Sequence, residues 1–222
     1  NPGDLPNNGL RYGNARDGIS LESGRLASVV SNIISGNGNN GVNITQRGND
    51  ILVKNNIIGL RKSQTKRLPN GWLNAVQAAP NNNLGPATVS TAAFNGNGVA
   101  QGSGCSLQGR DCGNVTIENN VISSNARDGI FMSSGSGNNI VRNNYIGTNS
   151  SGTAFGNTGN GITIFNDSNS IYTNTIANNG GSGITIMRNT NITIGNTTYG
   201  VPLLLPIPST AQNNRISQNS IF

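Results

Sequence analysis

The chain has 222 residues, enough for one or two domains, and fourteen basic against eight acidic residues give it a formal net charge of +6. It contains no histidine, which removes the commonest general base and transition-metal ligand, and two cysteines alone are a poor zinc site. No run of residues is long and apolar enough for a membrane-spanning helix. Only 33% of the residues are hydrophobic, so the chain is either disordered or a repeat fold with a narrow core, and periodicity separates the two.

In chain order, residues 1–12 are predicted to be an N-terminal extension, and two repeating motifs follow it. The first motif is a glycine followed by alternating apolar positions. It occurs at 18–21, 41–44, 129–132, 161–164 and 183–186. The second motif is an aliphatic residue, two further residues, asparagine, one residue and isoleucine. Its asparagines are Asn32, Asn56, Asn120, Asn144, Asn174 and Asn219, and its isoleucines are Ile34, Ile58, Ile122, Ile146, Ile176 and Ile221.

Both motifs alternate apolar and polar residues, which is the periodicity of a strand. A unit of 22 to 24 residues with two or three short strands cannot bury its apolar side alone, so identical units must stack. The isoleucines then form one inward row, and the asparagines form a ladder of side-chain amides at a bend. Glycine and asparagine are expected to mark the corners because both tolerate left-handed backbone conformations. The sequence therefore predicts an all-β, single-stranded parallel β-helix of about six coils, with Gly98-Val99 as the glycine motif of the third coil.

The spacing of the motifs locates the insertions in what we expect to be one domain over residues 1–222. Residues 61–97 form an inserted loop, eight residues are inserted around 149–156, and a Pro/Leu loop spans 196–212. The long loop also carries a basic cluster, which is either a solvated loop or a contact for an anionic glycan or surface. The cluster comprises Arg61, Lys62, Lys66 and Arg67.

The first two insertions leave the same corner of the stack on either side of a short corner at 125–129. Long loops on a rigid scaffold often carry function, so this arrangement predicts a cleft. We expect Arg127, Asp128, Trp72 and Tyr145 to contact a substrate there. The alternative is that the loops serve only for packing.

Cys105 and Cys112 enclose a short segment, 105–112. A disulfide between them fits an oxidising compartment, whereas two free thiols fit a reducing one. The chain starts without an initiating methionine or a signal peptide, which indicates a segment of a longer, processed protein.

The run Asn-Tyr-Ile-Gly-Thr-Asn at 144–149, with the glycine-rich residues that follow it to Ile162, resembles coils of the pectate-lyase-like right-handed β-helix superfamily. Residues 32–38 and 214–222 are similar to the same Asn/Gly-rich repeats, which are typical of very large bacterial secreted and surface proteins. The resemblance covers about residues 13–222 except the long insertion. It implies a right-handed helix and leaves function open, because the superfamily includes lyases, hydrolases, epimerases, phage tailspikes and adhesins.

Glycoside hydrolysis needs two converging carboxylates, and the sequence does not supply an evident pair. Asp17 and Asp128 share the motif Asn-Ala-Arg-Asp-Gly-Ile, but the corners between them place them three coils apart, roughly 14 Å at about 4.8 Å per coil. A local ion pair and an Asx turn explain the recurrence more simply. Polygalacturonases of the resembling superfamily would also show a Gly-His-Gly motif, which this chain lacks.

The first functional hypothesis is therefore an extracellular or cell-surface structural and adhesive segment, assembling end to end through open coil ends. The alternative is a polysaccharide-binding or polysaccharide-degrading protein. The sequence favours a protein without enzymatic activity over an enzyme, and both alternatives stay open. We expect no cofactor, and few aromatic stacking partners disfavour nucleic acid as a partner.

Overall fold

The computed structural model describes residues 13–22, 25–45, 50–71, 97–101, 112–132, 136–187 and 212–222. Within these ranges the chain forms three six-stranded parallel sheets and one two-stranded pair. The first sheet contains β1 (Ile19–Glu22), β4 (Val42–Thr45), β7 (Val99–Gln101), β11 (Ile130–Met132), β15 (Ile162–Ile164) and β18 (Ile184–Ile186). The second contains β2 (Ser28–Val30), β5 (Leu52–Lys54), β9 (Thr116–Glu118), β13 (Ile140–Arg142), β16 (Ser170–Tyr172) and β19 (Arg215–Ser217). The third contains β3 (Ile33–Ile34), β6 (Ile57–Ile58), β10 (Val121–Ile122), β14 (Tyr145–Ile146), β17 (Thr175–Ile176) and β20 (Ser220–Ile221), and the short pair is β8 (Cys112–Gly113) with β12 (Ser136–Gly137).

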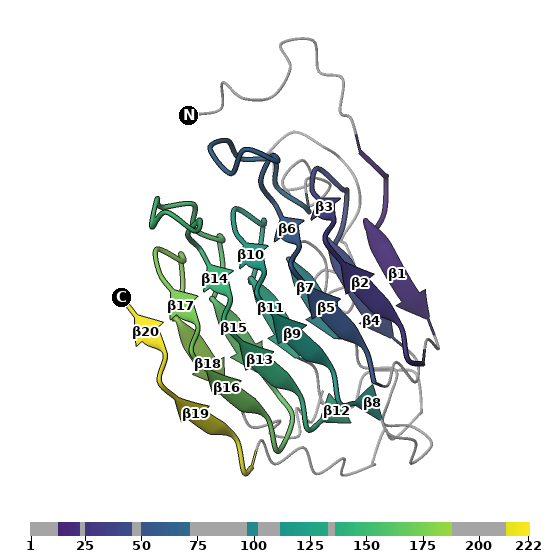
Figure 1. Cartoon of the computed structure of the whole chain (residues 1–222), viewed down its shortest axis with the longest axis vertical. Helices are drawn as coiled ribbons and strands as arrows, with labels where there is room; N and C mark the ends of the chain where they lie inside the picture. The colour runs from purple at the N-terminus through teal and green to yellow at the C-terminus, as the bar shows by residue number, and fades with distance from the viewer. Residues whose placement is uncertain are drawn as a thin grey trace, which may run out of the picture.

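Each coil contributes one strand to each of the three sheets, and the coils follow one another along the stack (Figure 1). Equivalent residues pair in register from coil to coil, as the sequence repeat predicts. The motif isoleucines form a single row of Ile34, Ile58, Ile122, Ile146, Ile176 and Ile221. Val99 pairs with Val42 on one side and Ile130 on the other, so it belongs to the third coil. These pairings confirm the predicted parallel β-helix of six coils.

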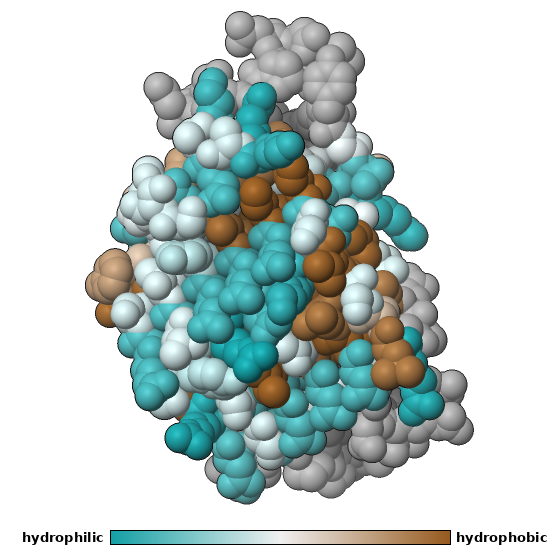
Figure 2. Space-filling view, viewed as in Figure 1, coloured by the Kyte–Doolittle hydropathy of each residue, from teal (hydrophilic) through white to brown (hydrophobic). Residues whose placement is uncertain are grey.

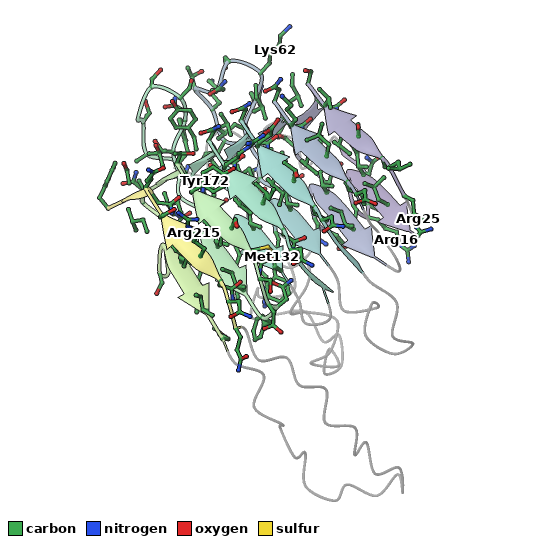
Figure 3. The ribbon with its side chains drawn as sticks, turned by 60° about the horizontal axis from the view of Figure 1, so that its bottom comes forward. Arg16, Arg25, Lys62, Met132, Tyr172 and Arg215 are labelled. Carbon is green, nitrogen blue, oxygen red and sulfur yellow. The ribbon has the colours of Figure 1, made fainter. Side chains whose placement is uncertain are left out.

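The core is one continuous cluster of aliphatic side chains that point inward from all three sheets. Most are isoleucine or valine, the residues that best fit a pleated, half-buried strand. Met132 adds a flexible thioether and is only 1% exposed (Figure 3). Two inward rows from the first sheet, through Ile130 and Met132, and one row from each of the other two sheets fill this narrow interior. A few aliphatic positions per coil are therefore enough, which explains how a chain with so few hydrophobic residues folds.

A tight corner of two residues joins the second sheet to the third in every coil. Its first residue has a left-handed backbone, with φ between 54° and 60° at Ser31, Asn55, Asn119, Asn143, Thr173 and Gln218. Its second residue is the predicted ladder asparagine. The left-handed conformation thus lies one residue before the ladder, and the prediction that the ladder asparagines themselves adopt it is wrong. Asn120, for example, has no positive φ. Its side-chain amide bonds to Asn144 of the next coil and so stabilises the corner.

A wide corner joins the third sheet to the first, running from the motif isoleucine to the glycine before the next strand. A Cβ added to Gly129 would lie 2.7 Å from the carbonyl oxygen of Gly161 and 2.7 Å from Cγ2 of Ile146. The equivalent glycines, Gly18, Gly41, Gly98 and Gly161, would meet the motif isoleucine of the same coil and the glycine carbonyl of the next coil. None of them is among the described residues with positive φ. These glycines are therefore required for close approach between coils and not for left-handed turns, contrary to the sequence-based expectation.

Several predicted segments lie outside the described residues, and one predicted insertion, 61–97, is interrupted by a residue of the stack. Asn70, inside the predicted 61–97 insertion, returns to the stack and bonds to its neighbours in two coils. The extension at 1–12, Trp72 and Cys105 lie outside the described residues, as does nearly all of 196–212. The side chain of Cys112 is not described either, so the disulfide stays a prediction. In the part of the chain that the structure describes, no helix is long and apolar enough to cross a membrane.

Candidate functional site

The predicted asparagine ladder runs along the tight corners of all six coils. From Asn32 to Asn219, each Nδ2 donates to Oδ1 of the next ladder residue at 2.9 to 3.2 Å. Asn120 also donates to the carbonyl of Val53 and receives the backbone N–H of Asn56 at 2.9 Å. A buried amide with every group bonded specifies register, because a shift by one residue would leave these groups unpaired. The ladder prediction is confirmed.

Two more polar columns run along the wide corners, and the sequence reasoning missed both. The entry column comprises Asn14, Asn37, Asn70, Asn125, Asn157 and Asn179, joined by amide bonds of 2.9 to 3.0 Å. The exit column comprises Asp17, Asn40, Asn97, Asp128 and Asn160, each accepting the backbone N–H of the next coil. The entry column could have been recognised from the asparagine three residues after the motif isoleucine. In two coils, however, an insertion moves this asparagine to Asn70 and Asn157.

Asp128 is a member of the exit column and not an isolated acid. Its Oδ1 accepts the backbone N–H of Asn160 at 2.7 Å, and the hydroxyl of Thr163 also bonds to it. Burial raises the pKa of the Asp128 carboxyl above its ordinary value, against the opposing effects of these two bonds and of Arg127.

Asp17 repeats this arrangement in the first coil. It accepts the backbone N–H of Asn40 at 2.9 Å and Nδ2 of Asn43 at 3.1 Å. The strands that follow the two aspartates, β1 and β11, are three pairings apart in the first sheet. The predicted separation is confirmed, and the shared motif acts as a bracket between coils.

Glu118 lies at the end of β9, on the outer face of the second sheet. It is 5% exposed and bonds to Nζ of Lys54 at 2.7 Å and to Nη2 of Arg142 at 2.6 Å. Hydrogen bonds from Lys54 and Arg142 hold the pKa of its carboxyl below the ordinary value, although burial opposes them. The carboxylate therefore joins three coils, and Arg142 continues the row by donating to the hydroxyl of Tyr172 at 3.2 Å. Figure 2 shows hydrophilic side chains over the middle of this face.

The remaining described carboxylates serve the same purpose. Asp50 accepts Nδ2 of Asn114 at 3.1 Å, and Asp167 accepts the backbone N–H of Gln212 at 2.6 Å. Each carboxylate whose side chain is described thus bonds to a neighbouring coil. Among the described residues, no three His, Cys, Asp or Glu side chains come together in a way that could hold a metal ion.

Two loops meet outside the third sheet and form what we call the clasp, residues 59–68 and 147–156 (Figure 1). They leave the second and fourth coils and meet over the third. Nδ2 of Asn149 donates to the carbonyl of Gln64 at 3.1 Å, and the hydroxyl of Ser150 lies 3.2 Å from Oε1 of Gln64.

Beneath the clasp, Leu60 and Phe155 bury the outward side chain of Val121 in a second apolar cluster. Arg67 lies over the Phe155 ring, 5.8 Å from its centroid. The described parts of the two insertions therefore close on each other, and the cleft predicted between them is not formed there. Burial of these apolar side chains is the physical reason for the closure.

The basic cluster lies on the first loop of the clasp. An antiparallel bridge between Leu60 and Arg67 closes this loop, and its four cations are exposed. Neither loop contains a carboxylate. Lys62 stands at the outer edge of the molecule, far from Arg16 and Arg25 at the first coil (Figure 3). The clasp thus holds a concentrated positive charge on a loop that is fixed at both ends.

The structure places the other predicted substrate contacts on separate elements. Arg127 is exposed on the wide corner, with Asp128 half-buried beside it. Tyr145 is 36% exposed on the outer face of the third sheet, where it pairs in register with Val121 and Thr175. Their role in substrate binding stays a prediction, as does that of Trp72.

Comparison with known families supports the architecture. A family model described as a right-handed beta helix region matches residues 74–222, more than half of the chain. Searches of curated proteins and of solved structures gave no match.

Proposed function

The chain belongs to the family of right-handed β-helix regions, and from that premise we propose that it is a structural and adhesive segment of an extracellular or cell-surface protein. The observation that carries the proposal is the use of its polar side chains. The described carboxylates and the asparagine-containing columns all bond from coil to coil. Such bonds make a rigid rod whose wide corners display loops.

The same observation weighs against catalysis. A general acid or base must exchange its proton with a substrate within hydrogen-bond reach, and a glycosidase needs two such carboxyls facing one bond. Asp128, one of the predicted substrate contacts, accepts a backbone N–H that the next coil requires.

A screen for activity tests this part of the proposal. The chain is incubated with acidic and neutral polysaccharides, and both new reducing ends and unsaturated products are measured. We expect no turnover with any of them. Turnover that disappears in Asp128→Asn would overturn the proposal.

A second candidate function, binding of an acidic polysaccharide, is favoured by the clasp. Its four exposed cations lie on one loop without a neighbouring carboxylate in either loop of the clasp, and a polyanion gains from several such contacts at once. Rigid attachment through Gln64 reduces the entropy lost on binding.

Adhesion to beads coated with an acidic polysaccharide tests this candidate. We expect the double variant Lys62→Gln, Lys66→Gln to lose about tenfold in affinity at low salt. The double variant Arg16→Gln, Arg25→Gln removes the same charge from exposed positions at the first coil and serves as the matched control. Equal losses in both variants would show that only net charge matters.

Assembly through coil ends is the remaining part of the proposal. In the sixth coil, Ile186, Ile216 and Ile221 are between 39% and 50% exposed. Beside them, β18, β19 and β20 pair with another described strand on one side only. A further coil, from a longer chain or from a second copy, would pair with these edges. Light scattering after size-exclusion chromatography should show a mass that rises with concentration; a constant monomer mass would remove self-assembly from the proposal.

A further inference from the structure

The wide corners contain a chemical liability that is independent of the proposed function: asparagine followed by glycine. In such a pair the glycine nitrogen, after losing its proton, can attack Cγ of the asparagine. Ammonia leaves, a five-membered succinimide forms, and water opens it to aspartate or isoaspartate. The reaction requires the nitrogen to be free and the side chain to reach a near-attack geometry. The described stack contains six such pairs, Asn37-Gly38, Asn40-Gly41, Asn70-Gly71, Asn97-Gly98, Asn160-Gly161 and Asn179-Gly180.

In every one of these pairs the glycine nitrogen is already a donor to a neighbouring coil. The acceptors are backbone carbonyl oxygens, and the distances lie between 2.8 and 3.1 Å. Gly41, for example, donates to the carbonyl of Asn97, and Gly98 donates to that of Asp128. The proton that must leave is therefore held in a hydrogen bond, and the nitrogen is not directed at Cγ.

The attacked side chains are held as well, because all six asparagines belong to the two wide-corner columns. Oδ1 of Asn40, Asn97 and Asn160 accepts a backbone N–H of the adjacent coil at 2.8 to 3.1 Å. In the entry column, Oδ1 of Asn37 and Asn179 accepts a side-chain amide at 2.9 to 3.0 Å. Rotation of the carboxamide toward the glycine nitrogen would break these bonds between coils.

We propose that these six pairs are deamidation sites that the coil-to-coil bonds keep inert, and that deamidation starts only where a coil opens. The two products have different consequences. Asp17 and Asp128 occupy the exit column and accept the same N–H bond, so an aspartate product keeps that bond at the three exit-column sites. At the entry-column sites aspartate loses a side-chain donor, as at Asn37 and Asn70. Isoaspartate inserts an extra methylene into the backbone and displaces the register of the coil.

The proposal is tested on the full wild-type chain at mildly alkaline pH, folded in buffer and unfolded in guanidinium chloride. Peptide mapping by mass spectrometry follows the mass gain at each asparagine, and a methyltransferase assay detects isoaspartate. We expect each of the six sites to deamidate at least about a hundredfold more slowly in the folded chain, because reaction then requires local opening.

Hydrogen exchange of the same six glycine amides supplies the second measurement. Their protection should match the slowing of deamidation, since one opening event exposes both the N–H and the side chain. Folded-state rates within about threefold of the unfolded rates would overturn the proposal. Free exchange at glycine amides whose asparagines stay intact would overturn it too, because the hydrogen bond would then not be the cause.

Discussion

The tight and wide corners of each coil turn the chain by different means. The tight corner has two residues in all six coils, with a left-handed residue followed directly by a ladder asparagine. In the wide corner, the distance along the sequence from the motif isoleucine to the corner glycine varies. It is seven positions from Ile34 to Gly41 and 40 positions from Ile58 to Gly98. The two polar columns and the corner glycine keep their places in the coils that carry an insertion, so the chain between these points can lengthen.

This difference explains where loops occur on the rod. An insertion in the tight corner would separate the left-handed residue from the asparagine whose amide bonds both neighbours. An insertion in the wide corner leaves the columns intact, as Asn70 and Asn157 demonstrate by keeping their places after the two clasp loops. The clasp and its basic cluster therefore lie at the corner where the scaffold tolerates them.

The largest expected effect comes from filling the close approach at the wide corner. Gly129→Ala places a Cβ 2.7 Å from Gly161 O and from Ile146 Cγ2, so two coils must separate. We expect a loss of about 3 kcal/mol or more in the free energy of unfolding, measured by urea denaturation. The control is Gly152→Ala, where φ is +79° but no atom lies within 4 Å, and the expected loss is about 1 kcal/mol. Equal losses would mean that the neighbouring groups yield to the added methyl group and that close approach does not select the corner glycine.

Exchanging asparagine for aspartate should separate the two kinds of column. Asn144 at the tight corner donates to the carbonyl of Ile117 and to Asn174, so Asn144→Asp removes two donors and brings carboxylate and carbonyl oxygens together. We expect a loss of about 2 to 3 kcal/mol at neutral pH. Asn160→Asp keeps its acceptor role toward Ser182 and loses one donation, to the hydroxyl of Thr163, so the loss should be about 1 kcal/mol. If chemical denaturation gave comparable losses in the free energy of unfolding for the two variants, the tight-corner ladder and the exit column would depend equally on side-chain donors.

The two corners should also respond oppositely to pH. The folded pKa of Glu118, just before the tight corner, is lowered, so its stabilisation is present above the ordinary glutamate pKa of about 4.3 and is lost as pH falls through the folded value. The folded pKa of Asp128 is raised, so its stabilisation is present below about 3.9 and is lost as pH rises through the folded value.

Glu118→Gln should lower the free energy of unfolding by about 1 kcal/mol at neutral pH and not in acid. Asp128→Asn should leave it unchanged or raise it at neutral pH. Urea titrations at several pH values check both, and parallel pH profiles for the two variants would contradict the assignment.

The smallest expected effect is a gain at the tight corner. Thr173 is β-branched and has φ of +54°, whereas Asn55, Asn119 and Asn143 hold this position in other coils. Thr173→Asn should raise the free energy of unfolding by about 0.5 to 1 kcal/mol, because asparagine tolerates the left-handed region better. Thr175→Asn, two residues on in β17, is the control and should be neutral or slightly destabilising. A loss at Thr173 would mean that the 2.6 Å bond of its hydroxyl to Asn143 outweighs the backbone strain.

Much of the candidate site could not be read from the sequence. The basic cluster was visible as a charge pattern, but its attachment to the second loop through Gln64 and Asn149 joins residues from different coils. Burial of Val121 under the clasp also reverses the ordinary expectation that a residue on the outer face of a solenoid is exposed. Asp128 was predicted to contact a substrate, and its place in the exit column was not recognised because its neighbour there, Asn160, comes after an insertion that interrupts the repeat.

The sequence alone determined the stack: six repeats of asparagine and isoleucine at fixed spacing fix the inward row, the tight-corner ladder and the register, since only parallel stacking satisfies them all at once. Tertiary structure decided what the spacing does not encode, namely which residue turns left-handed, why the corner glycines cannot carry a Cβ, and how two loops close over a third coil. The physical reason is the kind of contact that each feature depends on. Periodicity reports contacts that repeat identically in every coil, whereas close approach between coils and contact between loops depend on atoms that come together only when the stack has formed.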